Sequence, residues 1–566
     1  MITPSFAGHC AAVAMGLSGR LQALSRLRAC VLAVVAGSLI ALALPPFAGV
    51  PVLLVVFPVL ILLLDRARTL FEAGLFGWAF GFGFFCAGLY WIGGAFLVEG
   101  GYLIAVMPVA IGGLSAFLAL FPALATALAH LVWRPGGAER ILVLAGAWTL
   151  LEWLRGWVLT GFPWNPMGLV LAPFDAPLQI AALVGVFGLS LLVVAVAGLP
   201  VLLLDALGDR AQPSSKPLAP PGILRLAVGL PVLALLIGGA IWGQMRLADH
   251  PDPARYALAP GWAADPPAEP ATILRLVQPS ISQKDKWRRD QALINMDQYV
   301  ALSKMPGWLH VDAVIWGETA IPAPVNEVDF MRLSAARAAP PSGLLISGGL
   351  RLARTEAGPK VWNALFVLDG QGRVRDSYNK THLVPFGEYV PLRGALPLEH
   401  LLPGTNDFSF GDGLRTLMGG TGVGGAAPRL PGFSPLICYE AIFPGAVTAA
   451  EGDRPDWLLN ITNDGWYGDS TGPYQHLELV RLRAIEEGLP FIRVANTGIS
   501  GAYDGLGRGI SSLGYEKNSA LDLILPPPLN PPLYVSWGNA PTVILGFLFI
   551  FIGFLLRRMS VKQESI

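Results

Sequence analysis

Long apolar segments separated by short polar connections fill roughly the first 250 residues of the chain. A helix needs about 20 mostly apolar residues to cross the hydrocarbon core of a bilayer. The pattern therefore predicts seven membrane-spanning helices in this region and an eighth near the carboxyl end. We place the eight spans at about 28–47, 49–65, 71–96, 102–133, 140–160, 176–205, 223–243 and 540–557.

The stretch between the seventh and eighth predicted spans has shorter apolar runs and more charged residues. Runs with strand character alternate there with runs of helical periodicity, which is typical of an α/β domain. We predict helices at 290–305, 329–339 and 474–488, and a further helical stretch from Cys438 to Ala450. The predicted strands lie at 273–278, 313–316, 343–349, 361–369, 373–380, 436–438, 457–462 and 491–496.

Three parts of the chain follow from these two patterns. We expect an α-helical transmembrane domain at 1–244, an α/β domain outside the cytoplasm at 245–535, and a last transmembrane helix with a short tail at 536–566. The composition agrees, because 53% of the residues are hydrophobic and only 14% are charged, against about 25% charged in soluble domains. A formal net charge of zero gives no reason to expect a nucleic-acid partner.

Positive charges in the short connections predict the orientation in the membrane, because Lys and Arg favour the cytoplasmic side. Every second connection is basic, whereas those after the first, third and fifth spans carry almost no positive charge. We therefore expect both termini in the cytoplasm and region 245–535 outside. The basic residues are Arg20, Arg26, Arg28, Arg66, Arg68, Arg134, Arg140, Arg210, Lys216, Arg225, Arg557, Arg558 and Lys562.

Three chemically versatile residues stand at the ends of predicted strands in the α/β region. Cys438 is the only cysteine there, since Cys10, Cys30 and Cys86 lie near the amino end. Strand ends are where α/β folds commonly place their sites. A thiol nucleophile at Cys438, a carboxylate base at Glu318 and an amine at Lys380 that stabilises an oxyanion would form a covalent catalytic centre.

The sequence around these residues resembles the carbon–nitrogen hydrolase (nitrilase) superfamily, and more closely its membrane branch, the apolipoprotein N-acyltransferase family. The most specific similarity is the motif YNKTHLVPFGEYVPL at 378–392. Further matching motifs are Cys-Tyr-Glu at 438–440, NITNDGWYG at 460–468 and RVANTGISG at 493–501, with Gly-Phe-Pro-Trp at 161–164 in the transmembrane part.

The resemblance implies a fold and an activity. The outside domain would be an αββα sandwich with a Glu-Lys-Cys triad, joined to an eight-span membrane domain. The enzyme would take an acyl chain from a phospholipid and, through a cysteine thioester, deliver it to the α-amine of a diacylglyceryl-cysteine at the N-terminus of an apolipoprotein. This is the last step of bacterial lipoprotein maturation, and it implies the inner membrane with the catalytic domain on the periplasmic side. We expect no metal and no cofactor.

The same resemblance assigns roles to individual residues. Glu318, Lys380 and Cys438 would be catalytic, and Glu388, Tyr439 and Glu440 would support them. Weaker matches suggest that the substrates contact Trp287, Asn363, Gly161 and Trp164.

Several alternatives remain open from the sequence alone. Water could resolve the thioester, which would make the protein a membrane-tethered amidase or nitrilase. Cys438 could instead be a buried structural cysteine, or pair with His382 or His476. A transporter would need polar residues within its spans, and Glu152 and Arg155 are the main candidates, although they can pair on one helix face. The Gly- and Pro-rich stretch 393–430 is long enough for a lid.

Overall fold

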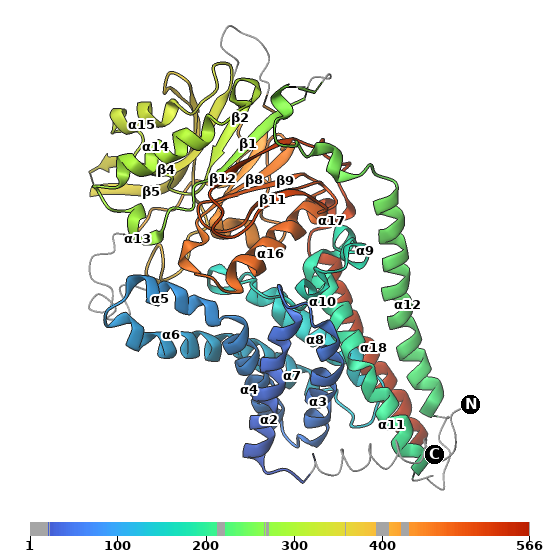
Figure 1. Cartoon of the computed structure of the whole chain (residues 1–566). Helices are drawn as coiled ribbons and strands as arrows, with labels where there is room; N and C mark the ends of the chain where they lie inside the picture. Colours follow the sequence, from blue (N-terminus) through green and yellow to red (C-terminus); the bar gives the residue numbers. More distant parts are fainter. Residues whose placement is uncertain are drawn as a thin grey trace. The chain divides into compact units, whose positions relative to one another are not determined.

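A computed structural model describes residues 21–564 except 22, 212–220, 265, 268–270, 357, 392–406 and 420–429. Cys10, Arg20, Lys216 and most of the proposed lid lie outside the described residues. The chain divides into two compact units, which are drawn together in Figure 1. Unit 1 is Met1–Asp249 with Leu533–Ile566, and unit 2 is His250–Pro532.

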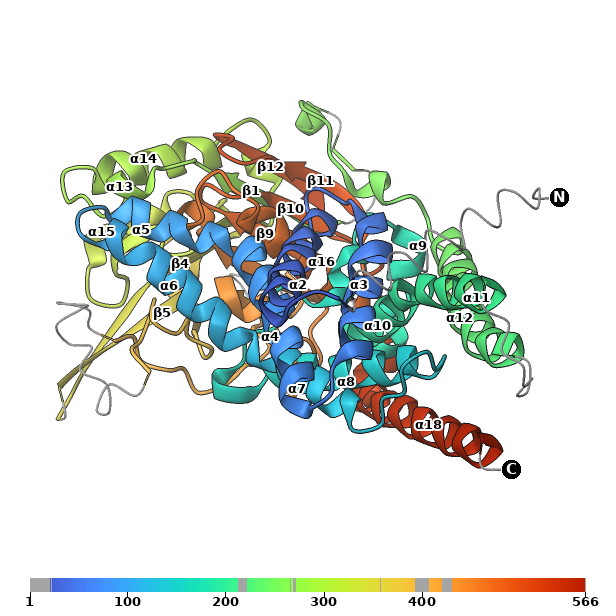
Figure 2. The ribbon, with the colours of Figure 1, turned by 90° about the horizontal axis from the view of Figure 1, so that it is seen from below.

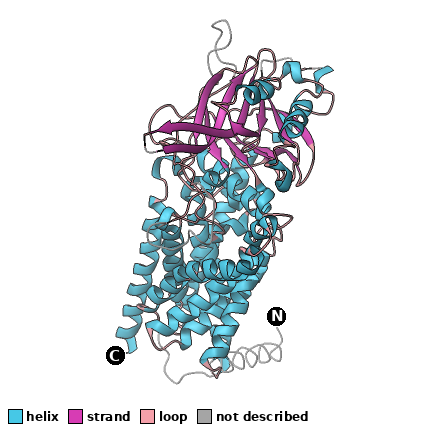
Figure 3. Ribbon diagram, turned by 90° about the vertical axis from the view of Figure 1, so that its left-hand side faces the viewer, coloured by secondary structure: helices cyan, strands magenta, loops and turns pink. Residues whose placement is uncertain are grey.

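Unit 1 is helical, as the cyan ribbons of Figure 3 show. Its helices are α2 (Arg26–Leu39), α3 (Leu53–Arg66), α4 (Leu70–Gly88), α5 (Gly93–Glu99), α6 (Leu103–Leu118), α7 (Leu120–His130), α8 (Arg140–Arg155), α9 (Asp175–Leu178), α10 (Ala181–Gly198), α11 (Pro200–Ala211), α12 (Pro221–Ala248), α17 (Leu533–Trp537) and α18 (Ala540–Glu564).

Six helical segments among the described residues are long and apolar enough to cross a membrane: Arg26–Ala43, Leu70–Gly88, Leu103–His130, Ala181–Leu207, Ile223–Ala248 and Ala540–Arg558. The other two predicted spans correspond to α3 and α8, which have 14 and 16 residues. At 1.5 Å per residue they extend about 21 and 24 Å, which is less than the hydrocarbon thickness of about 30 Å. Most of the residues of α8 are buried inside unit 1.

Glycines let α2 and α4 approach each other closely. A Cβ on Gly37 would lie 1.9 Å from the carbonyl oxygen of Phe80, and one on Gly83 would lie 2.0 Å from that of Val34. Close packing of this kind holds helices together in lipid, where the hydrophobic effect does not drive their association. The Gly-rich sequence of α4 is therefore explained by backbone packing.

Ion pairs connect helix ends within unit 1. Arg140, at the start of α8, is fully buried and bonds at 2.8 Å to both Asp65 near the end of α3 and Asp205 in α11. Arg26, at the start of α2, bonds at 2.8 Å to Glu72 near the start of α4. Arg140 is thus an internal cation, and the ends of α3, α8 and α11 meet around it.

Unit 2 contains two β-sheets, drawn in magenta in Figure 3. One sheet has the order β12-β1-β2-β4-β5-β6, with β3 paired to β4, and the other has the order β11-β10-β9-β8-β7. The strands are β1 (Ile273–Gln278), β2 (Ala313–Trp316), β3 (Ile321–Pro324), β4 (Leu344–Thr355), β5 (Gly358–Asp369), β6 (Val374–Asn379), β7 (Phe433–Ile437), β8 (Trp457–Thr462), β9 (Phe491–Ala495), β10 (Ser500–Tyr503), β11 (Gly509–Leu513) and β12 (Ser519–Ile524).

The two sheets pack face to face with helices outside them. Leu274 and Leu276 of β1 share one core with Leu459 and Ile461 of β8. The other face of the first sheet packs against α14 (Ala292–Ser303) and α15 (Asp329–Ala336), which lie beside it in Figures 1 and 2. The outer face of the second sheet packs against α16 (Gly472–Glu487). Unit 2 is therefore a four-layered α–β–β–α sandwich.

The helical stretch predicted from Cys438 to Ala450 is wrong. A short 3-10 helix, η10 (Cys438–Ile442), follows β7, and irregular turns follow it. Pro444 and Gly445 explain the difference, because proline cannot donate within a helix and glycine favours other backbone conformations. The chain can therefore turn sharply directly after the strand that carries Cys438.

A buried ion pair closes the first sheet, and its loss should destabilise unit 2. Arg275 of β1 bonds to Asp522 of β12 at 2.7 Å and also donates to the carbonyl oxygens of Ser303, Met305 and Pro306. Arg275→Met should lower the free energy of unfolding by about 3–5 kcal/mol, because the Asp522 carboxylate loses its cationic partner and keeps only the neutral Trp262 side chain as a donor. Thermal unfolding of the purified protein in detergent measures the effect.

The matched control is the exposed pair Arg354–Glu327, with its atoms 3.9 Å apart. Arg354→Met should leave the unfolding midpoint almost unchanged, since solvent screens such pairs. Equal losses for the two variants would contradict the assigned role of Arg275.

Candidate active site

Cys438 lies at a sharp turn between β7 and η10. Its φ of 52° lies in the left-handed region, which costs a residue other than glycine about 1–3 kcal/mol and persists only where the surroundings enforce it. The Asn460 amide supplies part of that enforcement, because it donates to the carbonyl oxygens of Leu436 at 3.1 Å and Cys438 at 3.2 Å. The turn therefore presents the thiol at the end of its strand, although only 8% of the residue is exposed.

Glu318 and Lys380 come together at the carboxyl ends of β2 and β6. Lys380 Nζ lies 3.7 Å from Glu318 Oε1 and bonds at 2.8 Å to Glu388 Oε2. Asn363 of β5 joins the two acids, because its Nδ2 donates to Glu318 at 2.7 Å and to Glu388 at 3.1 Å. Its Oδ1 is buried without a hydrogen-bond partner among the described residues. One ammonium, two carboxylates and one amide thus form a single network.

Charge within this network keeps Lys380 protonated. Burial alone would lower the pKa of its ammonium, but Glu388, Glu318 and the Cys438 thiolate outweigh burial, so the pKa lies above its usual value. Lys380 is therefore a permanent cation, suited to stabilise negative charge rather than to accept a proton.

The same surroundings disfavour a resting thiolate at Cys438. Burial, followed by the negative charge of Glu318, raises the pKa of the thiol to about 12, although Lys380 and the Thr462 hydroxyl act in the opposite direction. At neutral pH only about one molecule in 10⁵ would carry the thiolate. Attack by Cys438 consequently requires a base that removes the proton as the sulfur reacts.

Glu440 ties the Cys438 turn to the Lys380 turn. Its Oε2 accepts from the Ile437 amide at 2.8 Å, and its Oε1 accepts from the amides of Thr381 at 2.7 Å and His382 at 3.0 Å. The Tyr378 hydroxyl donates to the same oxygen at 2.8 Å. Because β6 and β7 belong to different sheets, this one carboxylate joins both sheets at the site.

A second buried polar cluster supports the Cys438 turn through Asn460. Arg493 of β9 donates to the Asn460 side chain and pairs with Asp464 at 2.6 Å. His476 of α16 lies 3.2 Å from Asp464 through Nδ1. Burial, followed by the charge of Arg493, lowers the pKa of His476 to about 4, although Asp464 acts in the opposite direction. His476 is therefore neutral at pH 7.

The structure brings most of the predicted site residues of unit 2 together, but not all. Tyr439 is buried, with its ring centroid 5.1 Å from that of Phe443. His382 stacks on Phe443 at 3.8 Å. Trp287 is 47% exposed at the end of α13 (Gln283–Lys286). Its neighbour Lys286, which the sequence did not single out, is buried and donates to the Glu318 carbonyl oxygen at 2.8 Å.

Lys286, Asn460 and Arg493 contribute to this site, although the sequence alone assigned them no role. Asn460 and Arg493 are the first residues of the motifs at 460–468 and 493–501. No spacing rule reveals that a lysine on a four-residue helix is buried. A charged residue inside an apolar strand, as in the Phe-Ile-Arg-Val-Ala run of β9, was the available signal for Arg493. Among the described residues, no group of three or more His, Cys, Asp or Glu side chains could hold a metal ion.

Gly161 and Trp164 lie in unit 1 and are described with that unit. Gly161 has a φ of 83°, and the buried Trp164 ring lies 4.7 Å from that of Trp91. Arg155 donates to the carbonyl oxygens of Phe162 and Trp164, and so holds this loop against α8.

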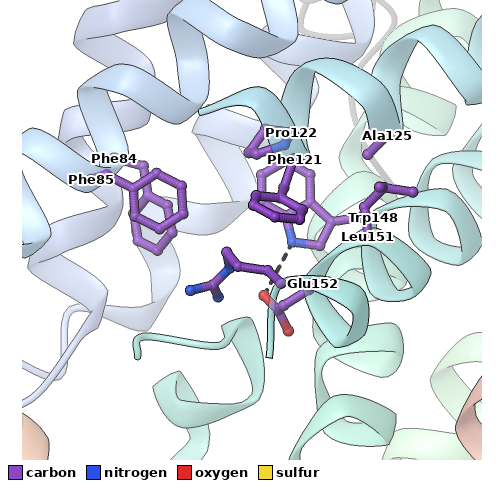
Figure 4. A pocket seen from close by; sticks show the side chains of 9 residues that line it. Phe84, Phe85, Phe121, Pro122, Ala125, Trp148, Leu151 and Glu152 are labelled. Carbon is purple, nitrogen blue, oxygen red and sulfur yellow. Dashed lines mark hydrogen bonds between the residues drawn. The ribbon is translucent and has the colours of Figure 1, made fainter. Parts of the chain in front are cut away.

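A small pocket in unit 1 has aromatic walls and one carboxylate. Figure 4 shows Glu152 beside Trp148, whose Nε1 lies 3.4 Å from Glu152 Oε2. The same oxygen accepts from the Met167 amide at 2.9 Å. Glu152 and Arg155 thus both hold the backbone of the segment after α8, which is a structural use of the two charges. The pocket is lined by Phe84, Phe85, Phe121, Pro122, Ala125, Trp148, Leu151, Glu152 and Arg155.

Comparison with known proteins agrees with the division into a helical unit and a carbon–nitrogen hydrolase-like unit. Residues 36–199 match the apolipoprotein N-acyltransferase N-terminal domain, and residues 273–527 match the carbon-nitrogen hydrolase domain. An apolipoprotein N-acyltransferase of Rhodopseudomonas palustris is 37% identical over 93% of this chain and 95% of its own length. One of Bradyrhizobium diazoefficiens is 38% identical over 94% of this chain and 95% of its own length.

These relatives cover nearly the whole chain, including both units. The chain therefore belongs to the apolipoprotein N-acyltransferase family and is an acyltransferase with a nitrilase-like α/β domain.

The buried neutral His476 should make unit 2 sensitive to mild acid. Its pKa is about 4 in the folded protein and about 6.5 in an unfolded chain. Between these values the unfolded state binds a proton that the folded state does not, so the free energy of unfolding falls as the pH drops from 6.5 towards 4. Unfolding at a series of pH values, followed by intrinsic fluorescence, measures the slope.

His476→Asn should flatten the slope in this window, even though it lowers stability overall. His310→Asn is the matched control, because His310 is exposed and should leave the slope unchanged. Asp464 does not interfere, since its depressed pKa places its own titration at a lower pH. A slope that is the same in all three proteins would show that His476 does not titrate in this way.

Proposed function

We propose that this enzyme transfers a fatty acyl chain from a membrane phospholipid to the N-terminal α-amine of S-diacylglyceryl-cysteine in apolipoproteins. The observation that carries the proposal is the buried network of Glu318, Lys380 and Asn363, together with the electrostatic coupling of Glu318 and Lys380 to the Cys438 thiol. A base, an oxyanion partner and a nucleophile in one buried network support covalent acyl transfer.

In the first half-reaction Cys438 attacks the ester carbonyl of the phospholipid. Glu318 accepts the thiol proton while the carbon–sulfur bond forms, which removes the need for a resting thiolate. Lys380 stabilises the negative charge on the carbonyl oxygen. The ester carbon–oxygen bond then breaks, and the lysophospholipid leaves with the proton returned by Glu318. The acyl chain remains on Cys438 as a thioester.

In the second half-reaction the α-amine of the lipoprotein attacks the thioester. The carbon–nitrogen bond forms, the carbon–sulfur bond breaks, and Glu318 moves one amine proton to the departing sulfur. Asn363 Oδ1 is a buried acceptor without a partner among the described residues, so it is suited to orient the incoming N–H group. Contacts of the substrates with Trp287, Gly161 and Trp164 are part of the proposal.

Glu388, Glu440 and Tyr439 act on the site indirectly in this scheme. Glu388 holds Lys380 at 2.8 Å and so fixes the ammonium where the oxyanion develops. Glu440 fixes the turn that carries Cys438 relative to the turn that follows Lys380. Tyr439 packs against His382 of the second turn, with ring centroids 5.8 Å apart.

We also propose that the enzyme crosses the bacterial inner membrane eight times, with both termini in the cytoplasm and unit 2 on the periplasmic side. The contacts of the basic helix ends support this arrangement. Arg140 joins the ends of α3, α8 and α11, and Arg557 of α18 donates to Leu131, just after α7. If α3 and α8 are counted as spans, the helix ends that these contacts join all lie on the same side of the membrane.

A second candidate is hydrolysis, in which water resolves the thioester. The carbon–nitrogen hydrolase match of unit 2 favours it, because the same three residues would serve either acceptor. The apolar helices and the match of residues 36–199 favour lipid substrates instead. The acceptor of the acyl group therefore separates the two functions.

Incubation with phospholipid should add the mass of one acyl chain to the purified protein, in a form that hydroxylamine removes. The labelled acyl-enzyme should then pass its label to a diacylglyceryl-cysteine peptide as a hydroxylamine-resistant amide, and only slowly to water. A shared covalent intermediate also implies ping-pong kinetics. Release of fatty acid at equal rates with and without the peptide would identify a hydrolase.

Variants test the assigned residues in the same assay. Cys438→Ala should abolish acylation, whereas Cys86→Ala should retain it. Glu318→Gln and Lys380→Met should each slow acylation by about 10²–10³-fold or more, as the loss of a single oxyanion donor does elsewhere. Near-normal acylation of a folded variant would remove that residue from the mechanism.

The proposed orientation has its own test. A reporter that is fluorescent only in the cytoplasm, fused after residue 300, should stay dark, because unit 2 is expected outside. The same reporter fused after residue 564 should be bright. A bright signal at residue 300 would reverse the topology.

A further inference from the structure

Lys286 is a second buried cation beside the Glu318–Lys380–Cys438 site. It is only 4% exposed and lies at the end of α13. Its Nζ donates to the backbone carbonyl oxygen of Glu318 at 2.8 Å. The helix is itself held at its start, where Ser282 caps it and the Gln283 side chain accepts from Asn463 at 2.8 Å, and near its end, where the Asn295 side chain donates to the Asp285 carbonyl oxygen at 3.2 Å. These contacts therefore hold the Lys286 side chain in place beside Glu318.

Burying this ammonium is costly unless a partner uses its charge. A buried cation loses several kcal/mol of hydration, and burial lowers the pKa of Lys286 to about 8, with Glu318 and then Cys438 acting against that fall. The two groups that favour its charged form are the base and the nucleophile of the proposed reaction. Because the Cys438 thiol is neutral at rest, the charge of Lys286 acts on Glu318 in the resting enzyme and on Cys438 only as its thiolate forms.

We propose that Lys286 is a positioning residue for acyl transfer, which fixes Glu318 through its backbone carbonyl and electrostatically favours the thiolate of Cys438. This inference rests on the proposed role of Cys438 as the nucleophile. Lys286 has a different task from Lys380, which is bonded to Glu388 and remains charged. Lys286 donates to the backbone carbonyl oxygen of Glu318, whereas Lys380 lies near the Glu318 carboxylate.

The proposal predicts an unusual pH dependence for the thiol. Below about pH 8 the charged Lys286 favours the thiolate, and above it the neutral amine no longer does. The other charges that act on Cys438 are Glu318 after β2, Lys380 after β6 and Asp464 after β8. Lys380 and Asp464 have pKa values displaced away from this range, so neither changes its charge near pH 8.

The rate of Cys438 alkylation by iodoacetamide, measured between pH 6 and pH 10, tests the proposal. The full-length protein in detergent is used, and the modified Cys438 peptide is quantified by mass spectrometry. In the unmodified protein the rate should rise tenfold per pH unit below pH 8, level off just above it, and rise again. In Lys286→Met the rate should be about tenfold lower below pH 8, since a charge at short range shifts a pKa by about 1–3 units, and this deficit should close above pH 8.

Two further variants separate charge from shape. Lys286→Arg keeps a cation and should retain most of the reactivity below pH 8. Lys284→Met lies on the same short helix but at an exposed position, and it should match the unmodified protein throughout. An equal deficit for Lys286→Met at every pH, or no deficit, would overturn the proposal.

The unmodified protein alone also provides a test if Lys286→Met does not fold. An alkylation rate that rises with a single slope through pH 8 would overturn the inference without any variant. Alkylation requires neither phospholipid nor lipoprotein, so its result is independent of whether the acceptor is an amine or water.

Discussion

One carboxylate, that of Glu440, connects the two sheets of unit 2 where the reactive groups meet. Its oxygens accept hydrogen bonds from the backbone on both sides, at Ile437 before Cys438 and at Thr381 and His382 after Lys380. Burial raises the pKa of Glu440, while these donors and Lys380 oppose that rise. Because a buried carboxylate with unmet hydrogen bonds is very costly, the two turns are held at the separation that satisfies it. The positions of Lys380 and Cys438 follow from this constraint.

The chemistry of the site depends on how its charges are distributed. Lys380 keeps its proton because the negative charges of Glu388 and Glu318 outweigh its burial, whereas Cys438 keeps its proton because of burial and, second, the same charge of Glu318. Glu318 lies 3.7 Å from Lys380 and, in the proposed mechanism, is the group through which a proton moves. The cost of assembling these charges is met during folding, so the catalytic groups need little reorganisation when the substrate arrives.

The sequence predicted the architecture better than the interior of the site. The apolar runs identified the helices of unit 1, and the all-buried strands β1, β2, β8 and β9 were recognised because each is mostly apolar. The strands β10, β11 and β12 were not predicted, since β10 and β11 are short and rich in Ser and Gly, and most residues of β11 and β12 are partly exposed. Their pairing partners, rather than their own propensities, make them strands.

The candidate triad was visible because each residue ends a recognisable strand. Asn363 was marked only by a loose resemblance, and its bridging hydrogen bonds depend on β5 lying between β4 and β6. The burial of Lys286 depends on tertiary contacts with the segment after β2, which lies about 30 residues further along the chain. Such non-local contacts leave no local periodicity in the sequence.

The pairing of β1 with β12 has a consequence for how the protein is made. Arg275 and Asp522 are 247 residues apart in the chain. The outer edge of β1 therefore stays uncovered until nearly all of unit 2 has been translated. Contacts of such long range are slow to form, and an uncovered strand edge invites wrong pairing. The last helix, α18, is synthesised only after β12. Completion of the sandwich and insertion of the final helix therefore fall at the same late stage of translation.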